Sequence, residues 1–133
     1  MSCGCNNKKT SYIYNLRECA LNNRKHKETL IAGDLMKISL MSVDCYGELG
    51  AEVHEDEDQL IVVACGSAIV KIGCACSSMQ SCYKLCAGES VFIPAGMWHN
   101  VCNAGNGSLK LYSVYAKAQD WDNDYDCGCD SGC

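Results

Sequence analysis

Short runs of apolar residues with strand-like periodicity dominate this chain. In residues 35–43, LMKISLMSV, and in residues 109–116, LKLYSVYA, apolar side chains recur at every second position over most of the run, as in a β-strand with one buried face. Residues 59–65, QLIVVAC, are almost continuously apolar and rich in β-branched side chains, which is typical of a buried strand. Shorter strands are predicted at residues 12–16, 28–32, 52–54, 68–72, 90–93 and 98–102.

Glycine-containing turns separate these runs. Gly33 predicts a hairpin turn, and Gly66 predicts a second hairpin that joins the strands on either side of it. Only residues 17–23 suggest a helical turn, and residues 73–86 show no clear periodicity. Many short strands with almost no helical period indicate an all-β fold, either a sandwich or a barrel.

Length and charge narrow the class of protein. A chain of 133 residues is long enough for one domain with a hydrophobic core. The net charge of -5 and the scattered Lys and Arg residues argue against a nucleic-acid-binding surface. No apolar run reaches the length of a membrane span, and the N-terminus shows no hydrophobic signal. We therefore expect a cytoplasmic protein without a membrane partner, with a spore coat or a surface layer as the alternative location.

Two blocks, residues 47–66 and residues 88–103, carry the candidate chemistry. Glu52 and His54 are two positions apart, so both would point to one face of a strand. His99 follows a Pro-x-Gly turn that would end one strand and aim the next. Two imidazoles, one carboxylate and the neutral amide oxygen of Gln59 are a plausible set of ligands for a divalent metal.

Both blocks resemble motifs of the cupin superfamily. The second block resembles the second cupin motif through five residues at fixed spacing: Gly88, Pro94, Gly96, His99 and Asn103. The first block is similar to the first cupin motif. Glu52 and His54 stand at its two His positions, Gln59 stands at its Glu position, and Gly66 is its closing Gly. The resemblance implies an all-β cupin double-stranded β-helix, a small jelly-roll barrel. This barrel would span residues 25–116, between a Cys-containing N-terminal segment (residues 1–24) with a short strand and an acidic Cys-rich tail (residues 117–133).

The chain departs from the usual first motif at three positions. Tyr46 stands where that motif usually begins with Gly, Glu52 replaces the first His, and Gln59 replaces the Glu. Glu-x-His followed by Gln is common among small single-domain cupins labelled "mannose-6-phosphate isomerase-like", which this chain resembles. A neutral amide oxygen is a weaker ligand than a carboxylate, so these changes lower the expected affinity for metal.

The label of that subgroup does not establish a reaction. A sugar-phosphate substrate would need Arg or Lys nearby, and the candidates Lys37 and Lys110 alternate with apolar neighbours, so one of them is expected to face outward. This argues against isomerase activity. No general acid or base is evident beyond the predicted ligands, and whether the chain is an enzyme stays open.

We expect a divalent transition metal (Zn, Fe, Mn or Ni) in the barrel, with His54, His99 and Glu52 as ligands and Gln59 as a weaker fourth. Asp58 competes with Gln59, but one residue of strand register places it on the opposite face. Open coordination positions would hold a small-molecule ligand. The family resemblance also implies a homodimer.

The thirteen cysteines have no counterpart in the family pattern. Cys65 and Cys102 lie within predicted strands and are expected to act as small apolar side chains. Three Cys-x-Cys pairs and three further residues differ from these: Cys3 and Cys5, Cys74 and Cys76, Cys127 and Cys129, with Cys82, Cys86 and Cys133. They could capture metal, cross-link chains or simply stay reduced. The alternative function is therefore a structural or coat-type protein that is cross-linked or metal-loaded through its cysteine-rich termini.

Overall fold

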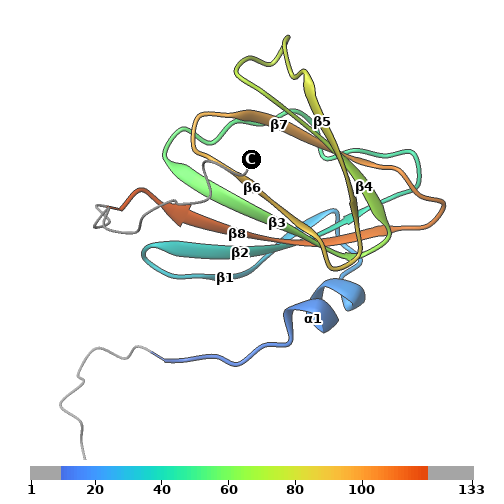
Figure 1. Cartoon of the computed structure of the whole chain (residues 1–133). Helices are drawn as coiled ribbons and strands as arrows, with labels where there is room; N and C mark the ends of the chain where they lie inside the picture. The colour runs from blue at the N-terminus through green and yellow to red at the C-terminus, as the bar shows by residue number, and fades with distance from the viewer. Residues whose placement is uncertain (1–9, 120–133) are drawn as a thin grey trace, which may run out of the picture.

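Two antiparallel sheets face each other in the computed structural model, which describes residues 10–119 (Figure 1). The larger sheet has the order β1-β2-β8-β3-β6 and the smaller one the order β5-β4-β7. The strands are β1 (Lys27–Ala32), β2 (Met36–Val43), β3 (Glu57–Cys65), β4 (Ser67–Gly73), β5 (Ser81–Cys86), β6 (Ser90–Ile93), β7 (Trp98–Asn103) and β8 (Leu109–Lys117). The predicted all-β jelly-roll barrel is confirmed.

The hairpin predicted around Gly66 is wrong. β3 and β4 follow each other in sequence but belong to different sheets, because β3 pairs with β6 and β8 whereas β4 pairs with β5 and β7. Gly66 adopts a φ of 99°, a left-handed value that suits glycine, and it lies close to the backbone of Leu109. The turn therefore carries the chain from one sheet to the other.

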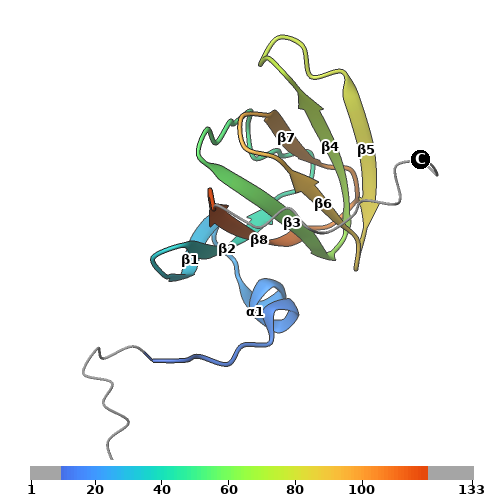
Figure 2. The same cartoon turned by 60° about the vertical axis from the view of Figure 1, so that its left-hand side comes forward.

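The strand predicted at residues 12–16 is also wrong, because a helix begins there. α1 spans Leu16–Asn22, and the side chain of its N-cap residue, Asn15, accepts a hydrogen bond of 3.1 Å from the backbone N–H of Glu18. Figure 2 shows α1 outside the barrel, next to the larger sheet. Ala20 is buried there in one cluster with Leu40 and Ala64. The helical turn predicted at residues 17–23 is thus confirmed.

Polarity changes along the barrel interior. The strands β2, β8 and β3 are neighbours, and their inward-facing residues form cross-strand rows. From the closed end of the barrel to its mouth, these rows are Met41–Leu111–Val63, Ser39–Ser113–Ile61 and Lys37–Tyr115–Gln59. The first row belongs to the main apolar core, whereas the last contains no aliphatic residue. The closed end therefore carries the hydrophobic packing, and the mouth carries polar groups.

Two further segments differ from expectation. β5 lies within residues 73–86, where no strand was predicted, and residues 52–54 form only an isolated bridge between Glu52 and His99. Across the described part of the chain, no helix is both long and apolar enough to cross a membrane.

Candidate metal centre

Backbone hydrogen bonds hold the two predicted motifs against each other. The N–H of Glu52 donates to the carbonyl of His99, and the N–H of His99 donates to the carbonyl of Glu52, both at 2.9 Å. The N–H of Gly96, in the turn after β6, donates to the carbonyl of His54 at 2.8 Å. The Pro-x-Gly turn and β7 thereby bring His99 beside the Glu-x-His segment.

His99 is buried on β7, where 4% of its surface is exposed. Its Nδ1 lies 3.2 Å from the carbonyl of Met97, which favours a hydrogen on Nδ1 and leaves Nε2 with a lone pair. Burial lowers the pKa of His99 and nearby His54 lowers it further, although the Met97 carbonyl and the Glu52 carboxylate oppose the shift. The ring is therefore neutral at neutral pH, which is the form that binds metal.

His54 packs between two other rings at the barrel mouth. Its ring centroid lies 5.5 Å from that of His99 and 5.2 Å from that of Tyr115. The Nε2 atom of His54 is buried and has no hydrogen-bond partner. The nearest carboxylate oxygen, Oε2 of Glu52, is 3.6 Å away, which is too long for a hydrogen bond.

Glu52 lies between His54 and a lysine. Its Oε2 is also 3.9 Å from Nζ of Lys27, and its side chain is 38% exposed. Two ligands at bonding distance from a tetrahedral zinc ion lie about 3.4 Å apart. The separation of 3.6 Å between Oε2 of Glu52 and Nε2 of His54 is close to this value. The pair therefore fits a shared ion.

Gln59 faces the interior from β3 and is 3% exposed. Its Nε2 donates to Oγ of Ser113 at 3.1 Å, and its buried Oε1 has no partner. Asp58 instead accepts a hydrogen bond of 2.9 Å from the N–H of Ala95. The strand register thus separates the two residues as predicted, and the amide oxygen is the one at the barrel interior.

The four predicted ligands share one end of the barrel without forming a closed site. Within residues 10–119, no three His, Cys, Asp or Glu side chains are grouped closely enough to hold a metal ion. Gln59 offers only a neutral amide oxygen, and the carboxylate of Glu52 also lies near the ammonium group of Lys27. Metal binding would therefore require the carboxylate and the imidazoles to draw together.

Three further residues lie at the mouth beside the predicted ligands, and of these only Lys37 was considered from sequence, as a candidate partner for a phosphate. Tyr115 is 2% exposed and packs against His54. Nζ of Lys37 and Nζ of Lys27 lie 4.7 and 5.6 Å from the centroid of the Tyr115 ring. Burial, together with the Glu52 carboxylate, raises the pKa of Tyr115 to about 12, so its hydroxyl stays protonated. Only the pairing of β1, β2 and β8 brings these residues together.

The other candidate lysine has a structural role. Nζ of Lys110 donates to the carbonyl of Asn23 at 2.6 Å and to Oγ of Ser42 at 3.0 Å. These contacts tie β8 to the end of α1, on the outside of the barrel. Of the two lysines considered from sequence, only Lys37 reaches the site.

A pocket of about 620 Å³ opens beside His54. Its walls are the segment Val53–Glu57 and the end of β8 at Lys117 and Ala118. The segment contributes three acidic residues to these walls: Glu55, Asp56 and Glu57. A ligand could reach His54 through this opening, and its wall on that side is negatively charged.

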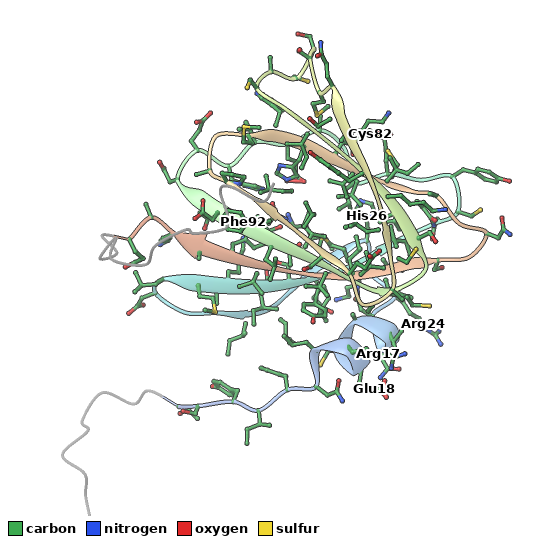
Figure 3. The ribbon with its side chains drawn as sticks, viewed as in Figure 1. Arg17, Glu18, Arg24, His26, Cys82 and Phe92 are labelled. Carbon is green, nitrogen blue, oxygen red and sulfur yellow. The ribbon has the colours of Figure 1, made fainter. Side chains whose placement is uncertain are left out.

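The cysteines give the alternative function no support in the described range. The eight cysteines of residues 10–119 are free thiols, and those at positions 74, 76, 82 and 86 are exposed. Figure 3 shows Cys82 on β5. Cys65 was expected to act as a small apolar side chain within a strand; it does end β3, but it is exposed, and a register shift separates it from Val63. The remaining candidates, Cys3, Cys5, Cys127, Cys129 and Cys133, lie outside the described residues.

Comparisons with known proteins support the fold and the motifs. The family model described as "Cupin domain" matches residues 40–115. YrkC of Bacillus subtilis is 32% identical over 105 residues, which are 79% of this chain and 56% of YrkC, so the chain spans little more than half of that relative. L612 of Acanthamoeba polyphaga mimivirus is 32% identical over 84% of this chain and 69% of its own. The crystal structure of BH2720 from Bacillus halodurans has a TM-score of 0.79 and 32% identity, and the match covers 86% of this chain and 87% of that one.

Proposed function

Because the chain belongs to the cupin domain family, whose members often bind metals and act on small molecules, we propose that its barrel mouth binds a divalent transition metal together with a small molecule. His54, His99 and Glu52 would hold the ion, and Gln59 would add a weaker neutral oxygen. Zn, Fe, Mn and Ni all accept such nitrogen and oxygen ligands. The chemistry that such an ion supplies is polarisation of an oxygen-bearing ligand.

The buried Nε2 of His54 is the observation that carries this proposal. A buried polar atom without a hydrogen-bond partner costs about 1–3 kcal/mol. Nε2 of His54 is such an atom, and a carboxylate oxygen of Glu52 lies beside it. A metal bond would satisfy both groups at once. The second ring, His99, is already neutral at neutral pH.

The residues around the ligands support their orientation. The carbonyl of Met97 fixes Nδ1 of His99, and Oγ of Ser113 holds the amide of Gln59. The ring of Tyr115 packs against His54 at an interplanar angle of 78°. Such contacts fix the tautomer and direction of metal ligands in many metalloproteins. In this chain they would orient each ligand individually, while metal binding draws the carboxylate and the imidazoles together.

Elemental analysis of the full chain, purified without chelator or metal-affinity resin, tests the proposal. We expect about one metal ion per chain in the wild type and loss of most of it in His99→Ala. His26→Ala is the matched control, because His26 is exposed and lies outside the site. A chain ending at Gln119 should retain the ion.

Metal that survives His99→Ala and disappears with residues 120–133 would assign metal binding to the cysteines and sink the assignment. Absence of metal from the wild type, even after incubation with each of the four ions, would refute the proposed metal centre altogether. Circular dichroism of each variant separates loss of the site from loss of the fold.

A further inference from the structure

We propose that the ligand of this site is a small anion, whose carboxylate or phosphate group pairs with Lys37 and Lys27. The inference rests on the proposed function, because it names the class of small molecule that the same mouth would take. It depends on the position of these lysines rather than on the identity of the metal.

Lys37 belongs to the row of inward-facing residues nearest the mouth. β2 pairs with β8 so that Lys37 is opposite Tyr115, and β8 pairs with β3 so that Tyr115 is opposite Gln59. Nζ of Lys37 lies 4.7 Å from the Tyr115 ring centroid, and His54 packs against the same ring at an interplanar angle of 78°. One aromatic side chain thus joins the lysine to the candidate metal centre.

Among the residues that the structure describes, neither ammonium group has a dedicated counter-ion. Lys37 makes no ion pair within 4.0 Å with residues 10–119, although it is half-buried. Lys27 has only Glu52, at 3.9 Å, and that carboxylate is also a proposed metal ligand. If Glu52 binds the ion, Lys27 loses its partner. The mouth then holds two unpaired ammonium groups, a state that favours binding of an anion.

Orphaned polar atoms lie on the same inner surface. Ser39 is two residues from Lys37 on β2, is fully buried, and has no hydrogen-bond partner for its Oγ. Oε1 of Gln59 is a second such atom. Buried polar groups are almost always satisfied by protein, water or a ligand. A hydroxyl donor and an amide acceptor next to the lysines could therefore bind an oxygen-rich molecule or an ordered water that accompanies it.

An acidic wall beside His54 restricts which anions fit. Glu55, Asp56 and Glu57 line the pocket beside His54, with Lys117 as the basic residue of that wall. A second negative charge on the ligand would be repelled where it approaches this acidic wall. The arrangement favours a small anion whose charge is concentrated at the lysine end.

Isothermal titration calorimetry with acetate and with inorganic phosphate tests the inference, using metal-loaded and metal-free full-length protein. We expect the wild type to bind at least one probe, more tightly when metal is present. Lys37→Met should weaken binding about tenfold, and Lys37→Arg should restore part of it. Lys27→Met should have its larger effect in the metal-loaded protein. Lys84→Met, a change at an exposed position on β5, is the matched control.

The outcomes separate the two proposals. A wild type that contains no metal, but binds a probe in a Lys37-dependent manner, supports the anion site and refutes the metal centre. A metal-loaded wild type that binds neither probe overturns the anion site alone. Equal affinities in Lys37→Met and Lys84→Met also overturn it and would leave Lys37 as a packing residue against Tyr115. Thermal melts identify any lysine variant that has lost the fold. If Lys37→Met does not fold, the probe affinities of Lys37→Arg and Lys27→Met test the anion site instead.

Discussion

At the residue scale, the burial of His99 links the site to the stability of the protein. The pKa of the folded state lies below 6.5, whereas unfolding exposes the ring and restores the ordinary value. Between pH 6.5 and the lowered pKa of the folded state, His99 therefore binds a proton in the unfolded chain but not in the folded chain. The contribution of His99 to stability is fully present above pH 6.5 and is lost as the pH falls through the lowered pKa.

Replacing His99 with Gln should remove this titration. In metal-free protein, we expect the free energy of unfolding to fall more steeply in the wild type than in His99→Gln as the pH drops below about 6.5, by at most about 1.4 kcal/mol per pH unit. Urea unfolding at each pH measures both slopes. His26→Gln should keep the wild-type slope, since His26 is exposed. Identical slopes for wild type and His99→Gln would contradict the neutral buried ring.

Gln59→Glu should separate stability from metal affinity. Without metal, the new carboxylate would be buried in place of an amide, so the melting temperature should fall. With zinc the same carboxylate becomes a charged ligand, so zinc affinity should rise about tenfold. Melting curves with and without zinc test both effects. Gln80→Glu, at an exposed loop position, should change neither quantity. A variant whose zinc affinity is unchanged would place Gln59 outside the ligand set.

Sequence alone predicted that some residues of this candidate site lie close together, and the reason is physical. Glu52 and His54 are neighbours in the chain, and the spacing around His99 resembles a known motif, so their proximity could be predicted. Lys27, Lys37 and Tyr115 lie far apart in sequence. They meet only because β1, β2 and β8 pair in one particular register, which hydrophobic periodicity does not specify.

At the scale of elements, the connections between strands separate the correct predictions from the wrong ones. Gly33 joins two strands of one sheet, as expected, because Gly33 donates to the carbonyl of Met36 across a tight turn. Gly66 looked equivalent in sequence, yet its turn crosses between sheets. The choice depends on which distant strands pair with each partner, and no local residue encodes it. The strand predicted at residues 12–16 failed because the N-cap at Asn15 starts a helix.

The turn after β2 contains a strained residue. Tyr46 has a φ of 66° and is 95% exposed, in a turn that is closed by a 2.8 Å hydrogen bond from the N–H of Gly47 to the carbonyl of Asp44. For residues other than glycine, this left-handed conformation costs about 1–2 kcal/mol of conformational energy. This is the position at which similar motifs usually carry Gly.

Tyr46→Gly should therefore stabilise the protein. Relief of backbone strain exceeds the added flexibility of the unfolded chain, so we expect a gain of about 0.5–1 kcal/mol in the free energy of unfolding. Urea unfolding measures it. Tyr46→Ala keeps the strain while removing the exposed ring, and it should stay within about 0.5 kcal/mol of the wild type. A loss of stability in Tyr46→Gly would show that the ring makes a contact that outweighs the strain.

At the scale of the whole molecule, apolar side chains remain exposed on one side. Tyr12 is 61% exposed, Ile13 is 99% exposed, and Leu35 and Met36 are each more than half exposed. Residues of this segment and of the β1–β2 turn line one groove of about 780 Å³. β1, next to it, is an edge strand of the larger sheet. The predicted homodimer stays a prediction, and this surface is where we expect the second copy to pack.

Light scattering after size exclusion tests this expectation. We expect the wild type to run as a dimer and the double variant Tyr12→Ser, Ile13→Ser to shift toward monomer, because contact between exposed apolar surfaces drives association. Phe92→Ser is the control, since Phe92 is 58% exposed on β6, on another part of the barrel. A wild type that is monomeric at every concentration would refute the predicted homodimer. A dimer that is lost in Phe92→Ser would place the interface at β6 instead.

The change from apolar to polar rows along β2, β8 and β3 has a consequence for how this protein can diversify. The rows of Met41 and Ser39 fill the closed end and contribute to the stability of the fold, whereas the row of Lys37 would contact the proposed anion. Substitutions in the outermost row would alter which molecule is selected while leaving the packed layers intact. The same eight strands can therefore acquire new chemistry at one end through a few changes, without a new fold having to evolve.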